Sequence, residues 1–156
     1  GDVVIIPSFT GIGAPYWRSD IKGAIFGLHR GTNKNHLIRA ALESIAFQVN
    51  DLVTAVNDDL SSPVSSLLVD GGAVKNDFLM QFQSDILNIS VKRPKQIEST
   101  ALGAGYLAGL GLGFWSSVNE LKKNKKIETV FKSEMSSLTR KLNLQKWKNA
   151  IDTLLR

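Results

Sequence analysis

The sequence predicts an α/β fold in which parallel strands are flanked by helices. Two observations support this prediction: short apolar runs alternate with helical patterns over residues 64–112, and each helical pattern begins soon after a strand ends. This order is typical of a parallel sheet with helical crossovers. The chain has 156 residues, 43% of them hydrophobic and 21% charged, which suits one globular domain or a large part of a two-domain protein.

Two short strands are predicted near the start of the chain. One covers residues 3–6, an apolar run that Pro7 ends, and the other covers residues 23–28, where glycines interrupt an apolar run. Residues 8–17 between them combine Gly and Pro with three large aromatic side chains. That composition favours an ordered loop over a flexible linker.

A long helix is predicted next. Apolar residues recur at spacings of three and four between Leu37 and Val56, which is the pattern of a helix with one face in the core. Asn33 or Asn35 can cap its start. The helix should end near residues 57–59.

A strand, a turn and a second helix follow. The strand covers residues 64–70 and runs directly into a Gly-Gly pair at 71–72. Asn76 or Asp77 should open the helix. Residues 89–93 are then predicted to form another strand, which completes one strand–helix–strand unit.

The next helix is unusually rich in glycine. Ser99 or Thr100 should cap it, and it should run from residue 101 to about residue 112. Glycine costs a helix roughly 1 kcal/mol relative to alanine, so we expect close packing against another backbone to compensate. Its apolar run of about 15 residues is shorter than a membrane span requires.

The last part of the chain is polar and basic. Residues 121–131 are predicted to be irregular, and an amphipathic helix is predicted from about residue 141 to 155. We therefore expect a core over residues 1–116, followed over 117–156 by a polar connector and a closing helix.

The net charge of +5 is concentrated in this last part, because residues 121–156 hold ten Lys or Arg and only three Asp or Glu. The lysine cluster at 122–126 is typical of a solvated loop rather than of a nucleic-acid-binding face. The chain has no cysteine, which is compatible with a reducing, cytoplasmic location. It begins with Gly1 and has no signal-peptide pattern, so we expect it to be a piece cut from a longer protein.

The strand–Gly-Gly–helix turn is the strongest candidate for a binding site. It follows a strand, and ligands of open α/β sheets bind at the carboxyl ends of strands. The Gly71-Gly72 pair would let a purine or ribose lie against the backbone, and the amide of Asn76 could hydrogen-bond the sugar or base. Free N–H groups at the helix start also favour phosphate. A tight turn in which Asn76 serves only as a helix cap is the alternative, and the residues alone leave both open.

No catalytic centre and no metal site are predicted. The two histidines lack partners at metal-ligand spacing, and the carboxylates are too scattered to suggest general acid–base work. The turn after residue 70 is not a Walker A loop, because no Gly-Lys-Ser/Thr follows it.

Three stretches resemble the FGGY carbohydrate kinase family, and within it the glycerol kinase branch. They cover residues 7–17, residues 23–28 with 36–43, and residues 69–86 with 100–104. Residues 11–15 read Gly-Ile-Gly-Ala-Pro, where sugar kinases of the family usually carry Gly-Glu-Arg-Thr-Pro. The resemblance covers nearly the whole chain and fades between residues 122 and 144.

The resemblance implies a segment of the C-terminal domain of such a kinase, with an actin-like ATPase (ribonuclease H-like) fold. It also implies transfer of phosphate from ATP, with Mg²⁺, to glycerol, which gives ADP and sn-glycerol 3-phosphate. Gly72 and Asn76 match the family positions that contact the adenosine part of the nucleotide.

The family's catalytic aspartate and phosphate-binding loops lie upstream of the matching segment. The isolated chain is therefore expected to be inactive. Its expected partners are the missing N-terminal domain, ATP and glycerol in the intact enzyme, and further copies in a homo-oligomer. A truncated interaction module without catalysis, or a kinase of another polyol or sugar, is the alternative.

Overall fold

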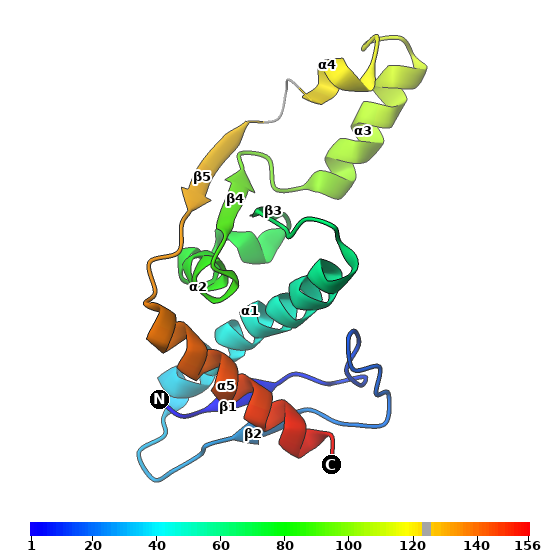
Figure 1. The fold of residues 1–156 in the computed structure, drawn as a ribbon. Helices are drawn as coiled ribbons and strands as arrows, with labels where there is room; N and C mark the ends of the chain where they lie inside the picture. The colour runs from blue at the N-terminus through cyan, green and yellow to red at the C-terminus, as the bar shows by residue number, and fades with distance from the viewer. Residues whose placement is uncertain (123–125) are drawn as a thin grey trace.

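The computed structural model describes residues 1–122 and 126–156, and in it the chain forms two small sheets with helices packed around them (Figure 1). Lys123 and Lys125 of the predicted lysine cluster lie outside the described residues. In chain order the elements are β1 (Val4–Ile6), β2 (Ala24–Phe26), α1 (Lys34–Asp59), β3 (Ser66–Leu68), the short 3₁₀ helix η1 (Gly72–Lys75), α2 (Asp77–Leu87), β4 (Ser90–Pro94), α3 (Ser99–Gly111), α4 (Val118–Lys122), β5 (Ile127–Phe131) and α5 (Ser137–Leu154).

The larger sheet is mixed rather than parallel. Its order is β3–β4–β5, with β3 parallel to β4 and β5 antiparallel to β4. The smaller sheet pairs β1 with β2 in antiparallel fashion. The α/β class is confirmed. Among the strands of the described residues, β3 pairs parallel with β4, whereas β5 returns antiparallel along the other edge of β4.

The prediction that residues 121–131 are irregular is wrong. This segment contains the last residues of α4 and the whole of β5. Val91 of β4 pairs with Phe131 and Lys92 pairs with Val130. The pairing partner lies about forty residues away in the sequence, so the strand depends on a tertiary contact that local composition does not reveal.

The hydrophobic core lies between α1, α2, α5 and one face of each sheet. Phe47 of α1 meets Phe82 of α2 edge to face, with ring centroids 5.5 Å apart. On its other side it stacks on Trp147 of α5 at 5.1 Å. Because Trp147 and Ile151 are fully buried, α5 is part of the core rather than an appended closing element.

The first long helix is confirmed at both ends. The side chain of Asn33 accepts hydrogen bonds from the backbone N–H groups of Asn35 and His36, and the helix ends at Asp59. The last helix begins at Ser137, four residues before the predicted start, because Ser136 caps it through the N–H of Thr139.

Helix α3 projects away from the body of the molecule, and none of its residues is buried (Figure 1). A Cβ added at Gly103, Gly105 or Gly111 would meet no atom within 4 Å, and one at Gly109 would meet the ring of Trp115. The expected close approach of another backbone is therefore wrong within the described residues.

Its predicted cap is wrong as well. Glu98 occupies the N-cap position without a side-chain cap bond, and Ser99 and Thr100 lie inside the first turn. Among the described residues, no helix is both long and apolar enough to cross a membrane.

One carboxylate fastens α5 and the β1–β2 loop to α1. The Oδ2 atom of Asp51 accepts a hydrogen bond from Trp147 Nε1 at 2.7 Å and another from the Tyr16 hydroxyl at 3.0 Å. The three residues are separated by up to 131 positions in the sequence. This contact links three segments of the core.

We predict that Trp147→Phe lowers the free energy of unfolding by about 2 kcal/mol, because Asp51 loses a charge-assisted hydrogen bond while an aromatic ring stays on Phe47. Urea unfolding followed by circular dichroism measures this. Trp17→Phe is the matched control, since Trp17 is 77% exposed and should change the stability by less than about 0.5 kcal/mol. Equal stabilities of the two variants would contradict the role given to Asp51.

Candidate functional site

The strand–Gly-Gly–helix turn lies at the carboxyl end of β3, beside β4. The backbone N–H of Gly71 donates to the carbonyl oxygen of Ile97, which follows β4, at 2.7 Å. Val74 in η1 is buried in the core, and its packing there fixes the turn to the body of the molecule. The backbone at 71–76 is therefore held from two sides.

The two glycines of the turn have different roles. Gly71 has a φ of +85°, a conformation that strongly favours glycine. Gly72 has no such requirement, and a Cβ built on it would meet no atom within 4 Å. Nothing in the fold of this chain therefore requires a glycine at position 72. Its lack of a side chain leaves the backbone there open and exposed.

Asn76 caps α2, as one of the two sequence-based readings predicts. Its Oδ1 atom accepts a hydrogen bond from the backbone N–H of Leu79 at 3.0 Å. The Nδ2 group has no hydrogen-bond partner within the described residues. The cap therefore uses only the acceptor half of the amide, and the donor half faces solvent.

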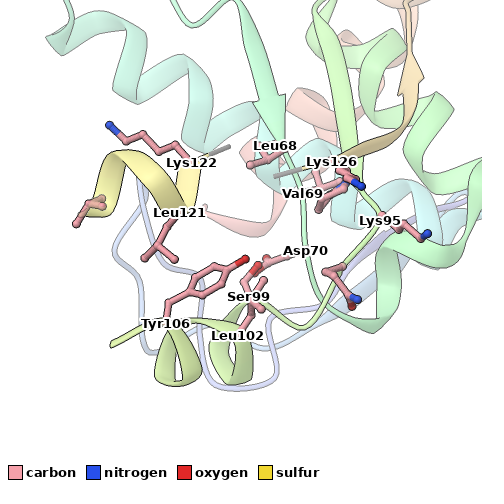
Figure 2. Close-up of a pocket in the computed structure, with 14 residues that line it drawn as sticks. Leu68, Val69, Asp70, Lys95, Ser99, Leu102, Tyr106, Leu121, Lys122 and Lys126 are labelled. Carbon is pink, nitrogen blue, oxygen red and sulfur yellow. The ribbon is translucent and has the colours of Figure 1, made fainter. Parts of the chain in front are cut away.

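A cavity of about 660 Å³ opens beside this turn, at the carboxyl ends of β3 and β4 (Figure 2). Its size lies within the range of small-molecule sites. Asp70, the residue before the Gly-Gly pair, lines it, but Gly72 and Asn76 do not. The lining combines apolar, polar and charged residues: Leu68, Val69, Asp70, Pro94, Lys95, Gln96, Ser99, Leu102, Gly103, Tyr106, Val118, Leu121, Lys122 and Lys126.

Sequence reasoning missed this cavity. Its walls come from β3, α3 and α4, which meet only in the folded chain, as Figure 2 shows for Leu68, Tyr106 and Leu121. The one available signal was positional, because residues just after parallel strands gather at the same edge of a sheet. Lys95 and Asp70 each follow closely on a strand of the parallel pair.

Two groups with raised pKa values, Asp51 and Tyr16, lie elsewhere. Burial raises the pKa of Asp51, an effect that the hydrogen bonds from Trp147 and Tyr16 partly oppose. Burial and the neighbouring carboxylate likewise raise the pKa of Tyr16. Neither residue lines the cavity, and their shared hydrogen bonds join core elements. We therefore interpret this pair as structural.

The described residues contain no group of three or more His, Cys, Asp or Glu side chains placed to hold a metal ion.

These features define an α/β domain with a cavity and an open glycine turn at the carboxyl ends of two parallel strands. Residues 1–112 match the model of the FGGY family of carbohydrate kinases, C-terminal domain. This match covers more than two thirds of the chain. The chain therefore belongs to the FGGY carbohydrate kinases.

Known proteins support this placement. The chain is 53% identical to the glycerol kinase of Desulfitobacterium hafniense over 99% of its own length, which is 31% of that protein. It superposes with a TM-score of 0.86 and 38% identity on the crystal structure of Plasmodium falciparum glycerol kinase with ADP, covering 99% of this chain and 31% of the other. The chain thus spans about a third of the length of the relatives it matches.

A more distant structure shows the same fold. The gluconate kinase of Lactobacillus acidophilus superposes with a TM-score of 0.80 at 24% identity, covering 99% of this chain and 31% of that protein. The expected actin-like kinase fold is confirmed.

We predict that Asn76→Ala lowers the unfolding free energy by about 1 kcal/mol, because α2 loses its N-cap acceptor. Asn76→Asp should keep full stability, since aspartate caps as well as asparagine does. Asn149→Ala on the exposed side of α5 is the control and should not destabilise. Urea denaturation of the three variants gives the comparison, and an unaffected Asn76→Ala variant would refute the capping role.

We also predict a pH dependence that originates in Asp51. The pKa of Asp51 is raised in the folded state, so its protonated form adds to the free energy of unfolding. This contribution is complete below about pH 4 and is lost as the pH rises through the folded-state pKa. The stability of the unsubstituted chain should therefore fall relative to Asp51→Asn as the pH rises above about 4. Unfolding free energies measured at several pH values test this, and a constant or opposite difference would overturn it.

Proposed function

We propose that this chain is the nucleotide-binding part of a glycerol kinase. In the complete enzyme ATP and glycerol react to give ADP and sn-glycerol 3-phosphate. The observation that carries the proposal is the turn at 71–76, where an open glycine and a free amide donor lie at the carboxyl ends of parallel strands. The 53% identity to a protein named glycerol kinase supports glycerol as the substrate.

In this proposal Gly72 and Asn76 bind the adenosine part of the nucleotide. The open backbone at Gly72 accepts the flat face of the base or ribose. Asn76 caps α2 with its oxygen and donates to the nucleotide from Nδ2. The structure of the Plasmodium falciparum relative with ADP supports a nucleotide as the ligand class.

The proposal assigns no catalytic residue to this chain. Phosphoryl transfer depends on groups that position the phosphates and the attacking hydroxyl. Mg²⁺ would reach the site with the nucleotide phosphates, a common mode for this ion. The proposal places the catalytic base and the contacts to the phosphates in the two thirds of the enzyme that the chain does not match. It keeps the cytoplasmic location expected from the sequence.

The partner of this chain would be that remaining part of the kinase. Helix α3 buries none of its residues, and Leu107, Leu112 and Phe114 on and after it are each more than 70% exposed. An apolar surface of this kind marks a contact with another segment of protein. We assign it to the contact with the remaining part of the kinase.

The test uses a chimaera in which this chain replaces the matching 31% of the Desulfitobacterium hafniense glycerol kinase. We predict that Gly72→Val in the chimaera weakens ADP binding about tenfold or more in calorimetry, a loss of about 1.4 kcal/mol. The reason is that a side chain at this position would occupy ligand space while meeting nothing in the chain itself.

Gly13→Val serves as the control, because Gly13 is equally open but lies in the β1–β2 loop. Unchanged ADP affinity in Gly72→Val would refute the site. A chimaera that forms no glycerol 3-phosphate from ATP in a coupled assay would refute the function. Turnover by the isolated chain would refute the assignment of catalysis to the remaining part of the enzyme.

A further inference from the structure

Arg93 links β4 to the turn at 71–76. Its side chain is 13% exposed, although its two acidic neighbours are largely solvated. The Nη1 atom donates to the carbonyl oxygen of Val74 at 3.0 Å and to Asp77 Oδ1 at 2.6 Å. Both acceptors belong to the segment that begins with Gly72.

The rest of the guanidinium group is fixed by β5. The Nε atom donates to Glu128 at 3.2 Å, and Nη2 donates to the hydroxyl of Thr129 at 3.2 Å. The guanidinium carbon also lies 5.3 Å from the centre of the Phe131 ring. Contacts on both sides leave the group a single orientation, which a flexible point charge such as lysine would not have.

The two acceptors in the turn lie on either side of Asn76. Val74 is the third residue of η1 and Asp77 is the first residue of α2, so Arg93 binds the backbone just before the capping asparagine and a side chain just after it. The carbonyl oxygen of Val74 is the more important acceptor, because the carboxylate of Asp77 is 75% exposed and exposed ion pairs contribute little.

We propose that Arg93 is a positioning residue for the nucleotide. It does not contact the ligand itself. It orients the backbone around Asn76, and through that backbone it sets where the free Nδ2 donor and the open surface of Gly72 lie. This role rests on the proposed function, since the turn must bind a nucleotide for its orientation to affect affinity.

The experiment compares Arg93→Met, Arg93→Lys and Arg18→Met in the chimaera described above. Arg18 is the matched control, because its guanidinium group pairs with Asp20 in the β1–β2 loop and donates to the carbonyl oxygen of Leu155, and neither partner belongs to the turn. We expect Arg93→Met to raise the KM for ATP and the Kd for ADP about tenfold, as for the loss of one or two charge-assisted hydrogen bonds.

The KM for glycerol should not change in Arg93→Met. Arg93→Lys should recover part of the loss, since one ammonium group can reach one of the acceptors but cannot span both. Arg18→Met should match the unsubstituted chimaera. An equal rise of both KM values, or an unchanged Kd for ADP, would overturn the positioning role and leave Arg93 as a stabilising residue only.

A second measurement uses the 156-residue chain itself and does not depend on activity. Amide hydrogen exchange at residues 72–77 should become faster in Arg93→Met, while exchange in the middle of α1 should stay the same. Uniformly faster exchange, or no change in the turn, would contradict the proposal. If Arg93→Met fails to fold, Arg93→Lys gives the same comparison in both assays.

The two proposals can fail separately. A chimaera that makes no glycerol 3-phosphate rejects the proposed function. The exchange experiment on the chain still decides whether Arg93 orders the turn.

Discussion

The parallel pairing of β3 with β4 is the constraint on which the rest of the site depends. It brings the carboxyl ends of both strands to one edge, so the turn after β3 lies beside the segment after β4. The bond from Gly71 to Ile97 and the bonds from Arg93 to the turn are consequences of this adjacency. The cavity of about 660 Å³ opens at the same edge. A shift in the register of this pair would separate all of these contacts.

This pairing is in turn supported from one side by helices. Phe47, Phe82 and Trp147 bring α1, α2 and α5 into one aromatic cluster. The turn at 71–76 leads directly into the first residue of α2. The carboxylate of Asp85 near the end of α2 accepts hydrogen bonds from the two backbone N–H groups of Glu134 and Met135, which precede α5. The C-terminal segment thus stabilises α2, and α2 stabilises the turn.

Local chemistry predicted much of this fold. The caps of α1 and α2 and the amphipathic face of α5 follow from short sequence patterns, because a capping side chain and the backbone N–H group that donates to it lie within three residues of each other. Strand β5, the cavity and the network of Arg93 could not be predicted in this way. Each of them joins segments that are distant in the sequence, such as Arg93 and Glu128.

The glycines of α3 also could not be interpreted from local sequence alone. Their number led us to expect close packing against another backbone, and the described residues supply no such partner. Glycine in a helix is unfavourable unless another backbone approaches. The chain spans about a third of its relatives' length, and the contact proposed for α3 is with the remaining part of the kinase. The turn differs in this respect, because Gly71, Val74 and Arg93 hold its backbone with contacts that lie entirely within this chain. The shape of the turn therefore does not depend on a contact outside this chain.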